Sequence, residues 1–299
     1  MRDRGHIATE EAHPGADQLE TMGTAEALAL MHASDASVLE ALEAARDELT
    51  ALVDAASETL RSGGRICYVG AGTSGRLGVL DATECPPTFG VEPEVVQAII
   101  AGGEAAIAGA VEHAEDDPAA GAAEVAARAL SEGDLVIGIA ASGTTPFVHG
   151  ALACAREHGA RTALIACVPR EQVPDDHPLG ARLLVGPEVL AGSSRLKAGT
   201  ATKLALNAIS TLAMARAGKT YRGHMVDVNT RANSKLVERG VRLVTRFGEV
   251  ERARATELLE AARGSAKAAI VMARRDTDLP GARALLDEAN GFLAEVLDR

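Results

Sequence analysis

The sequence predicts an α/β protein built on a parallel β-sheet, and two observations support this prediction. Short apolar runs alternate with longer segments of helical pattern between residues 66 and 185. Most of these runs are continuously apolar, which is typical of strands covered on both faces by helices. The expected strands are 66–69, 95–100, 135–140, 162–167 and 182–185. The expected helices between and after them are 73–82, 103–114, 118–131, 145–158 and 197–217.

The remaining residues divide into an N-terminal arm, N-terminal helices and a C-terminal helical tail. Residues 1–23 combine Gly, Pro and mixed charge without a period, so we expect a flexible arm there. The chain after residue 229 is helical by pattern to its end, with breaks at Gly248, Gly264, Pro280 and Gly291. We therefore predict an arm over 1–23, a sheet domain that includes the N-terminal helices over 24–228, and a helical subdomain over 229–299.

The composition limits the classes of function. The chain has 299 residues and a formal net charge of -12, which argues against a nucleic-acid partner because such binding needs a basic face. The cysteines form no C-x-x-C pair and the histidines show no metal-ligand spacing, so we expect reduced thiols and no metal site. The N-terminus has no apolar signal core and no apolar run approaches the length of a membrane span, which predicts a cytoplasmic protein without a membrane partner.

The turn after the first strand is a candidate anion site. Residues 70–75 have the spacing G-x-G-x-x-G, with Thr73 and Ser74 between the second and third glycines. Backbone N–H groups and the dipole at the following helix N-terminus favour a negative charge. A dinucleotide-binding turn is the competing interpretation. The two hydroxyls, the Pro86-Pro87 pair that should shorten the helix, and a second strand that ends without an acidic residue favour a phosphosugar instead.

Two further stretches have similar character. Residues 141–146, with the sequence ASGTTP, follow the third strand, and ligands in open α/β sheets bind at the carboxyl ends of the strands. The alternative is that Ser142 and Thr144 are ordinary helix N-caps with Pro146 in the first turn, and capping is compatible with ligand binding. Residues 186–200 place Ser, Arg and Lys at a helix N-terminus, where cations oppose the dipole and so indicate an anionic partner. A solvated basic turn is the alternative for this third stretch.

Two glutamates stand out because the local sequence does not explain them. Glu84 precedes Cys85 and the proline pair, and proline restricts its predecessor, so we expect the helix to end near Glu84. Glu115 lies just before Asp117 and Pro118, which are explained as an N-cap and a first-turn proline. From exposure alone, surface solvation is the better interpretation of both glutamates.

Residues 70–90 closely resemble the signature of the N-acetylmuramic acid 6-phosphate etherases, a family within the sugar isomerase (SIS) superfamily. The runs DATECPPTFG over 81–90 and GSSRLKAGT over 192–200 are its most specific parts. The resemblance continues through residues 100–103, 114–116, 138–143, 225–228 and 291–293. It implies an SIS-type three-layer sandwich with a five-stranded parallel sheet, usually a homodimer, and a reaction that needs no metal or organic cofactor.

The resemblance also implies a reaction and its residues. The substrate would be N-acetylmuramate 6-phosphate, cleaved to N-acetylglucosamine 6-phosphate and D-lactate in cell-wall amino-sugar recycling. Glu84 matches the family's proton donor and Glu115 its base. Thr144 stands where family members commonly carry Arg. The candidates for binding the substrate and its phosphate are Gly72, Thr73, Ser74, Ser142, Gly143, Thr145, Ser193, Ser194 and Lys197.

Two alternative functions stay open on the same fold. An aldose–ketose isomerase could use Glu188 as its base, and it would form a ketose phosphate instead of lactate. A non-catalytic sugar-phosphate sensor, similar to the glucokinase regulatory protein, could lose both the acid and the base. Both Glu84 and Glu115 are present here.

Overall fold

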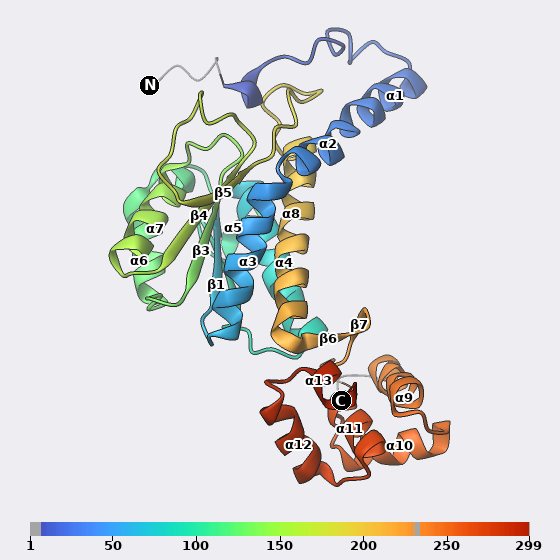
Figure 1. Cartoon of the computed structure of the whole chain (residues 1–299). Helices are drawn as coiled ribbons and strands as arrows, with labels where there is room; N and C mark the ends of the chain where they lie inside the picture. Colours follow the sequence, from blue (N-terminus) through green and yellow to red (C-terminus); the bar gives the residue numbers. More distant parts are fainter. Residues whose placement is uncertain (1–6, 229, 231–233, 299) are drawn as a thin grey trace. The chain divides into compact units, whose positions relative to one another are not determined.

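The computed structural model of the chain describes residues 7–228, 230 and 234–298 (Figure 1). By its internal contacts the chain divides into two compact units. The first unit comprises residues 1–82 and 94–210, and the second comprises residues 83–93 and 211–299. The predicted domain boundary at residue 228 therefore falls within the second unit, and Asn229, where the helical subdomain was expected to begin, lies outside the described residues.

The first unit is built on a five-stranded parallel sheet with the strand order β2-β1-β3-β4-β5. This arrangement confirms the α/β fold class. All residues of β1 and β3 are buried, as their continuous apolar pattern predicts. The strands are β1 (Ile66–Gly70), β2 (Val96–Ile100), β3 (Leu135–Ile139), β4 (Arg161–Ala166) and β5 (Leu179–Arg182).

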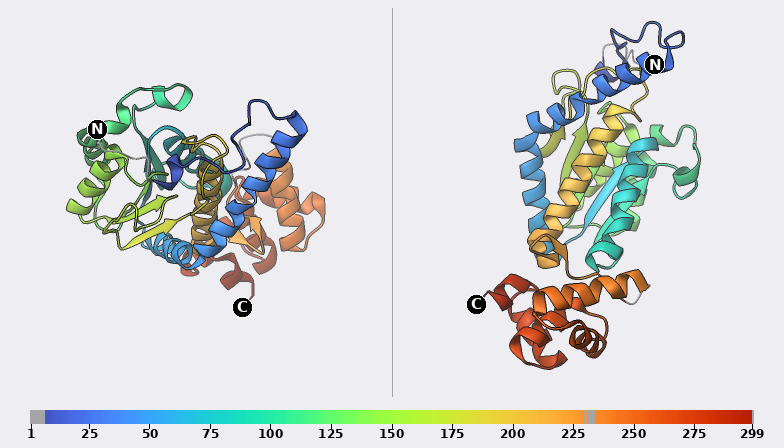
Figure 2. Two further views of the ribbon diagram at one scale, coloured as in Figure 1. Left: turned by 90° about the horizontal axis from the view of Figure 1, so that it is seen from above. Right: turned by 90° about the vertical axis from the view of Figure 1, so that its right-hand side faces the viewer.

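Helices cover both faces of this sheet, so the fold has three layers. Cys67 and Val69 of β1 face a core shared with helices α6 and α7. Tyr68, which points the opposite way, donates a 3.0 Å hydrogen bond to Asp81 of α4. Figure 2 shows α8 between α3 and α4 on that second face. The helices of this part are α1 (Thr24–Asp35), α2 (Ser37–Ala44), α3 (Arg46–Arg61), α4 (Gly72–Phe89), α5 (Ala105–Ala108), α6 (Pro118–Ala127), α7 (Pro146–Glu157) and α8 (Lys197–Met214).

Two elements of the first unit differ from the sequence-based expectation. The last strand is β5 (Leu179–Arg182), so the prediction of a strand over 182–185 is wrong apart from its first residue. The apolar run suggested the later position, but pairing with β4 places residues 179–182 in register with 163–166. A helix over 103–114 is also wrong: α5 ends after four residues, because Gly109 takes an extended conformation, and only a 3-10 turn at Ala114–Asp116 follows.

Helix α4 is longer than expected. It continues to Phe89, so the prediction that it ends near Glu84 is wrong. Cys85 and Phe89, one turn apart, are only 2% and 5% exposed, and burying them offsets the cost of Pro86 and Pro87 inside the helix. Gly90 then ends the helix in a left-handed conformation with φ of 62°, which favours glycine.

Residues 7–10 of the predicted arm are attached to the first unit, whereas residues 11–23 are mostly exposed. Ile7 is 3% exposed and packs with Ala166 and Val168. The N–H of Ala8 donates to Oε1 of Gln172 over 3.0 Å. Residues 1–6 of the predicted arm lie outside the described residues.

Where the structure describes it, the second unit is helical apart from a small antiparallel hairpin. The breaks expected at Gly248, Gly264 and Gly291 are confirmed, since each lies at or between helix ends. Pro280 does not break a helix, because it lies in the first turn of α12, which the Asp278 carboxylate caps. The elements are β6 (Thr220–Tyr221), β7 (His224–Met225), α9 (Ser234–Gly248), α10 (Arg252–Ala261), α11 (Ala266–Arg275), α12 (Leu279–Glu288) and α13 (Leu293–Leu297).

The cysteines of both units are buried. Burial raises the pKa of Cys67 and of Cys167 to about 12, so neither thiol is an activated nucleophile. Across the described part of the chain, every helix is too short or too polar to cross a membrane.

Candidate active site

The turn between β1 and α4 brings the helix unusually close to the strand. A Cβ on Gly75 would lie 2.6 Å from Cγ1 of Ile100 and 2.7 Å from the carbonyl oxygen of Gly70. No larger residue fits at Gly75, and Gly72 takes a positive φ of 52°. Because α4 begins at Gly72, Thr73 and Ser74 lie in its first turn, where backbone N–H groups have no acceptor within the helix. This geometry suits an anion.

The loop between β3 and α7 leaves the sheet beside that turn. Strands β1 and β3 are parallel neighbours, and Gly70 is in register with Ile139, so both loops begin at the same edge. Within the second loop, Oγ of Ser142 lies 2.9 Å from Oγ1 of Thr144. The N-cap of α7 is Thr145, and its side chain makes no capping hydrogen bond. The alternative, in which Ser142 and Thr144 are the caps of this helix, is therefore wrong, and the Thr145 hydroxyl makes no capping hydrogen bond to α7.

The side chains of His149 and Arg182 support this second loop, although the sequence did not indicate them as site residues. Nε2 of His149 lies 2.8 Å from the carbonyl oxygen of Gly143, so the ring donates to that oxygen. A Cβ on Gly143 would lie 3.3 Å from Nη1 of Arg182, which is 7% exposed. Nη1 donates to the carbonyl of Val168 over 3.2 Å. No sequence spacing indicated these contacts, because His149 lies on α7 and Arg182 on β5.

A buried acid holds Arg182 in place. Asp175 forms an ion pair with Arg182 and accepts a 3.0 Å hydrogen bond from the N–H of His177. Burial raises the pKa of Asp175, whereas the His177 N–H and the Arg182 guanidinium lower it. The lowering effects together are larger, so the pKa of Asp175 lies below its ordinary value. Gly143 therefore packs against the guanidinium of an arginine that is held in a buried ion pair.

The third stretch is a solvated turn only in part, because Arg195 is exposed whereas Lys197 is buried. Glu188 is 1% exposed, and its carboxylate accepts hydrogen bonds from the N–H groups of Lys197 (3.0 Å) and Ala198 (2.9 Å) at the start of α8. The sequence indicated an anionic partner at this helix N-terminus. The Glu188 carboxylate of the chain itself is one such partner. The Lys197 ammonium donates to the carbonyl of Val185 over 2.8 Å. Burial lowers the pKa of Lys197, against the opposing effect of Glu188.

The start of α8 lies beside the start of α4. A Cβ on Gly199 would lie 3.4 Å both from Cγ2 of Thr73 and from the carbonyl oxygen of Ser194. Ser193 and Ser194 are half-buried in the turn that precedes α8. The first unit therefore brings the 193–199 segment next to the glycine turn.

Glu115 is exposed on the 3-10 turn Ala114–Asp116 of the first unit. The following helix begins as expected, because the Asp117 carboxylate accepts from the N–H of Ala120 over 3.0 Å. The loop before this turn is attached to α4, since Arg76 donates to the carbonyls of Ile107 (3.1 Å) and Gly109. Glu115 thus follows a loop anchored to the helix that begins at the glycine turn.

Glu84 is exposed on α4 and belongs by its contacts to the second unit. It precedes Cys85, whose side chain is buried. Within the described ranges, no three His, Cys, Asp or Glu side chains gather as metal ligands.

Comparisons with known proteins relate the chain to several others. The family model for the N-terminal SIS domain of the glucokinase regulatory protein matches residues 48–156. An N-acetylmuramic acid 6-phosphate etherase from Gloeobacter violaceus is 50% identical and covers 100% of this chain and 97% of that protein. The etherase of Crocosphaera subtropica is 48% identical and covers 99% and 97%. A phosphoheptose isomerase structure from Neisseria gonorrhoeae has a TM-score of 0.46, with 18% identity over 64% of this chain and 98% of that one.

Proposed function

Because the chain belongs to the N-acetylmuramic acid 6-phosphate etherase family, we propose that it cleaves the D-lactyl ether of N-acetylmuramate 6-phosphate. The products are N-acetylglucosamine 6-phosphate and D-lactate, in cell-wall amino-sugar recycling. The observation that carries this proposal is the 50% identity to a relative of that name over the whole chain.

The substrate's 6-phosphate binds between the two hydroxyl loops of the first unit. Two features support this placement: β1 and β3 are neighbours, and the Thr145 hydroxyl is not used as a helix cap. Thr73, Ser74, Ser142 and Thr145 supply hydroxyls, and Gly72 and Gly143 allow the backbone to approach closely. Ser193, Ser194 and Lys197 add contacts from the start of α8.

The reaction is an elimination followed by an addition of water. In the open-chain sugar, the C1 aldehyde acidifies the proton on C2. The Glu115 carboxylate removes that proton, a double bond forms between C2 and C3, and the C3–O bond to lactate breaks. Glu84 gives its proton to the departing oxygen, so lactate leaves as a neutral alcohol at that position.

Water then adds to C3 of the unsaturated aldehyde. Glu115, now protonated, returns a proton to C2, and a proton from the water is taken up by the carboxylate of Glu84. The two glutamates thus end in their starting protonation states. This division between one acid and one base is the usual one for paired carboxyl groups.

We also propose a cytoplasmic homodimer that needs no metal or organic cofactor and binds no nucleic acid. The family resemblance supports the dimer and the absence of a cofactor. The net charge of -12 supports the absence of a nucleic-acid partner.

The two alternative functions are less well supported. An isomerase that uses Glu188 as its base requires an available carboxylate, whereas both Glu188 oxygens accept N–H groups at the start of α8. A sugar-phosphate sensor is suggested by the family model, which matches only residues 48–156, whereas the etherase relatives match the whole chain.

The first prediction concerns the two glutamates. Glu84→Gln and Glu115→Gln are each expected to lower kcat for D-lactate release by about 10²- to 10⁴-fold, because each removes one proton-transfer step. D-lactate is measured with purified protein and N-acetylmuramate 6-phosphate. Glu112→Gln, which changes an exposed glutamate three residues before Glu115, is the matched control and should keep wild-type activity. Full lactate release by either variant, or a ketose phosphate as the product, would contradict the proposal.

A further inference from the structure

Lys267 in the second unit is a buried cation that the proposed reaction does not use. Its side chain is only 8% exposed, and it lies in the first turn of α11, which Ser265 caps. Burial and the helix dipole both disfavour an ammonium at this position. Burial lowers the pKa of Lys267, and Asp227 opposes this effect. The contacts of Lys267 must therefore compensate for these costs.

These contacts join separate segments of the second unit. Nζ of Lys267 donates to Oδ2 of Asp227 over 2.6 Å and to the carbonyl of Gly218 over 2.9 Å. A second cation, Lys219, lies 3.7 Å from the same Asp227 oxygen. The ion pair fixes Asp227 against both α11 and the turn after α8.

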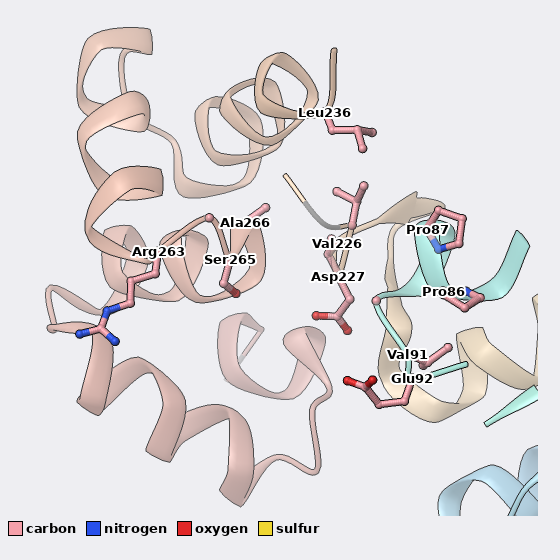
Figure 3. Close-up of a pocket in the computed structure, with 13 residues that line it drawn as sticks. Pro86, Pro87, Val91, Glu92, Val226, Asp227, Leu236, Arg263, Ser265 and Ala266 are labelled. Atoms are coloured by element: carbon pink, nitrogen blue, oxygen red, sulfur yellow. The ribbon is translucent and has the colours of Figure 1, made fainter. Parts of the chain in front are cut away.

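Asp227 in turn contacts the end of α4. A Cβ on Gly90 would lie 2.2 Å from the carbonyl oxygen of Asp227, so the helix end rests directly on that backbone. Figure 3 shows the same region: Asp227 lies between Ser265 on one side of the cavity and Pro86 and Pro87 on the other, and its carboxylate points away from the two prolines. The cavity has a volume of about 680 Å³.

The end of α4 needs such an anchor. Pro86 and Pro87 have no N–H to donate, so the last turns of α4 contain fewer helical hydrogen bonds than an ordinary helix. Glu84 lies six residues before Gly90 and just before this weakened part. Its orientation therefore depends on where the helix end is held.

We propose that the buried Lys267–Asp227 pair is the positioning device for Glu84. The ion pair holds the backbone of Asp227 in place, and Gly90 packs against that backbone. The position of Gly90 then determines where the end of α4 lies, and with it the carboxyl group of Glu84. This inference rests on the proposed role of Glu84 as the proton donor. Lys267 and Asp227 act through Glu84 and touch no reacting atom.

The test, which is the second prediction, combines Lys267→Met with Glu84→Gln in the full-length protein. Lys267→Met alone is expected to lower kcat for D-lactate release by about 10- to 100-fold, since small displacements of a reacting group have effects of that size. KM is expected to stay within about threefold, because the phosphate loops belong to the first unit. The double variant is expected to be no slower than Glu84→Gln within about twofold, because Lys267 acts only through Glu84.

A purely structural role for Lys267 gives a different pattern. The fold-losses in kcat of the two single variants would then multiply in the double variant. Alternatively, kcat per folded molecule would not change in Lys267→Met. Either result overturns the inference. Arg252→Met, which breaks the exposed Arg252–Glu238 pair of the same unit, is the matched control and should keep wild-type kcat. Asp227→Asn keeps the shape of the side chain and is used if Lys267→Met does not fold, with the same expected loss.

The result also separates this inference from the proposed function. If Glu84→Gln loses activity and Lys267→Met does not, the inference fails and the proposed function stands. If Glu84→Gln keeps full activity, the assigned role of Glu84 fails and the inference fails with it.

Discussion

Gly75 shows how a single residue determines where the phosphate turn lies. A Cβ on Gly75 would overlap both the end of β1 and Ile100 of β2, so there is no room for a side chain at this position. Thr73 and Ser74 are presented at the sheet edge only because α4 begins this close to the strand. The chemistry of the turn thus depends on a residue that has no polar side chain.

The third prediction follows at this scale. Gly75→Ala is expected to destabilise the protein by about 1–3 kcal/mol, because the added methyl group overlaps Ile100 and the Gly70 carbonyl. KM for the phosphosugar should rise as well, since the start of α4 must move away from β1. Urea unfolding and initial-rate kinetics measure the two effects. Gly23→Ala is the control, because a Cβ there meets nothing within 4 Å. An unchanged KM for Gly75→Ala would show that this turn does not hold the phosphate.

At the scale of elements, the helix N-termini of the first unit fall into two kinds. The starts of α6 and α8 are satisfied by carboxylates of the chain itself, from Asp117 and Glu188. The N-cap of α7, Thr145, makes no such hydrogen bond with its side chain. Helices of the first kind need their caps for stability, whereas α7 leaves its cap hydroxyl available to a ligand.

The fourth prediction compares these two kinds of cap. Thr145→Val is expected to change the free energy of unfolding by less than about 0.5 kcal/mol, because no capping bond is lost, while KM rises about tenfold. Asp117→Ala is expected to show the opposite pattern, with a loss of about 0.5–2 kcal/mol and an unchanged KM. Thermal unfolding and the lactate assay, run side by side, give both quantities. A stability loss in Thr145→Val without a KM change would assign Thr145 a capping role only.

At the scale of the whole molecule, the first unit contains buried ionic groups whose charge depends on folding. Burial raises the pKa of Asp134, but hydrogen bonds from Arg65 and from the N–H of Ser131 lower it below its ordinary value. Asp175 behaves in the same way beside Arg182. Burial also lowers the pKa of His177 from 6.5. Each of these groups binds a proton more readily in the unfolded chain than in the folded one.

The fifth prediction is the pH dependence of stability. A carboxyl whose folded pKa is lowered stabilises the protein fully above its unfolded pKa, near 3.8, and loses this contribution as the pH falls through the folded value. Burial also keeps His177 neutral in the folded protein. As the pH falls below about 6.5, this histidine is protonated more readily in the unfolded chain, so the free energy of unfolding decreases. The urea midpoint should therefore decrease from pH 7 to pH 3, in two ranges.

Asp134→Asn tests the assignment. It should lower stability at pH 7 by about 1–3 kcal/mol, since Arg65 loses its charged partner, and it should reduce the slope below pH 4. Asp17→Asn, an exposed aspartate of the same unit, should leave both unchanged. The assignment would be wrong if Asp134→Asn had the acid slope of the wild type.

The fold class, four of the five strands and the positions of the hydroxyl loops could be predicted from local sequence patterns. Continuous apolar runs, glycine turns and the Asp117-Pro118 start are local patterns, and local patterns follow from the period and backbone preferences of neighbouring residues. The family resemblance also rests on contiguous runs such as residues 81–90 and 192–200.

The packing of the folded chain accounts for the continuation of α4 through Pro86 and Pro87, the register of β5, and the capping of α8 by Glu188. The packing of Arg182 against Gly143 and the Lys267–Asp227 pair beside Gly90 are likewise visible only in the folded chain. These features depend on burial and on hydrogen bonds between residues distant in the chain. Their energies exceed the local preferences that a sequence pattern records, so no local pattern could have indicated them.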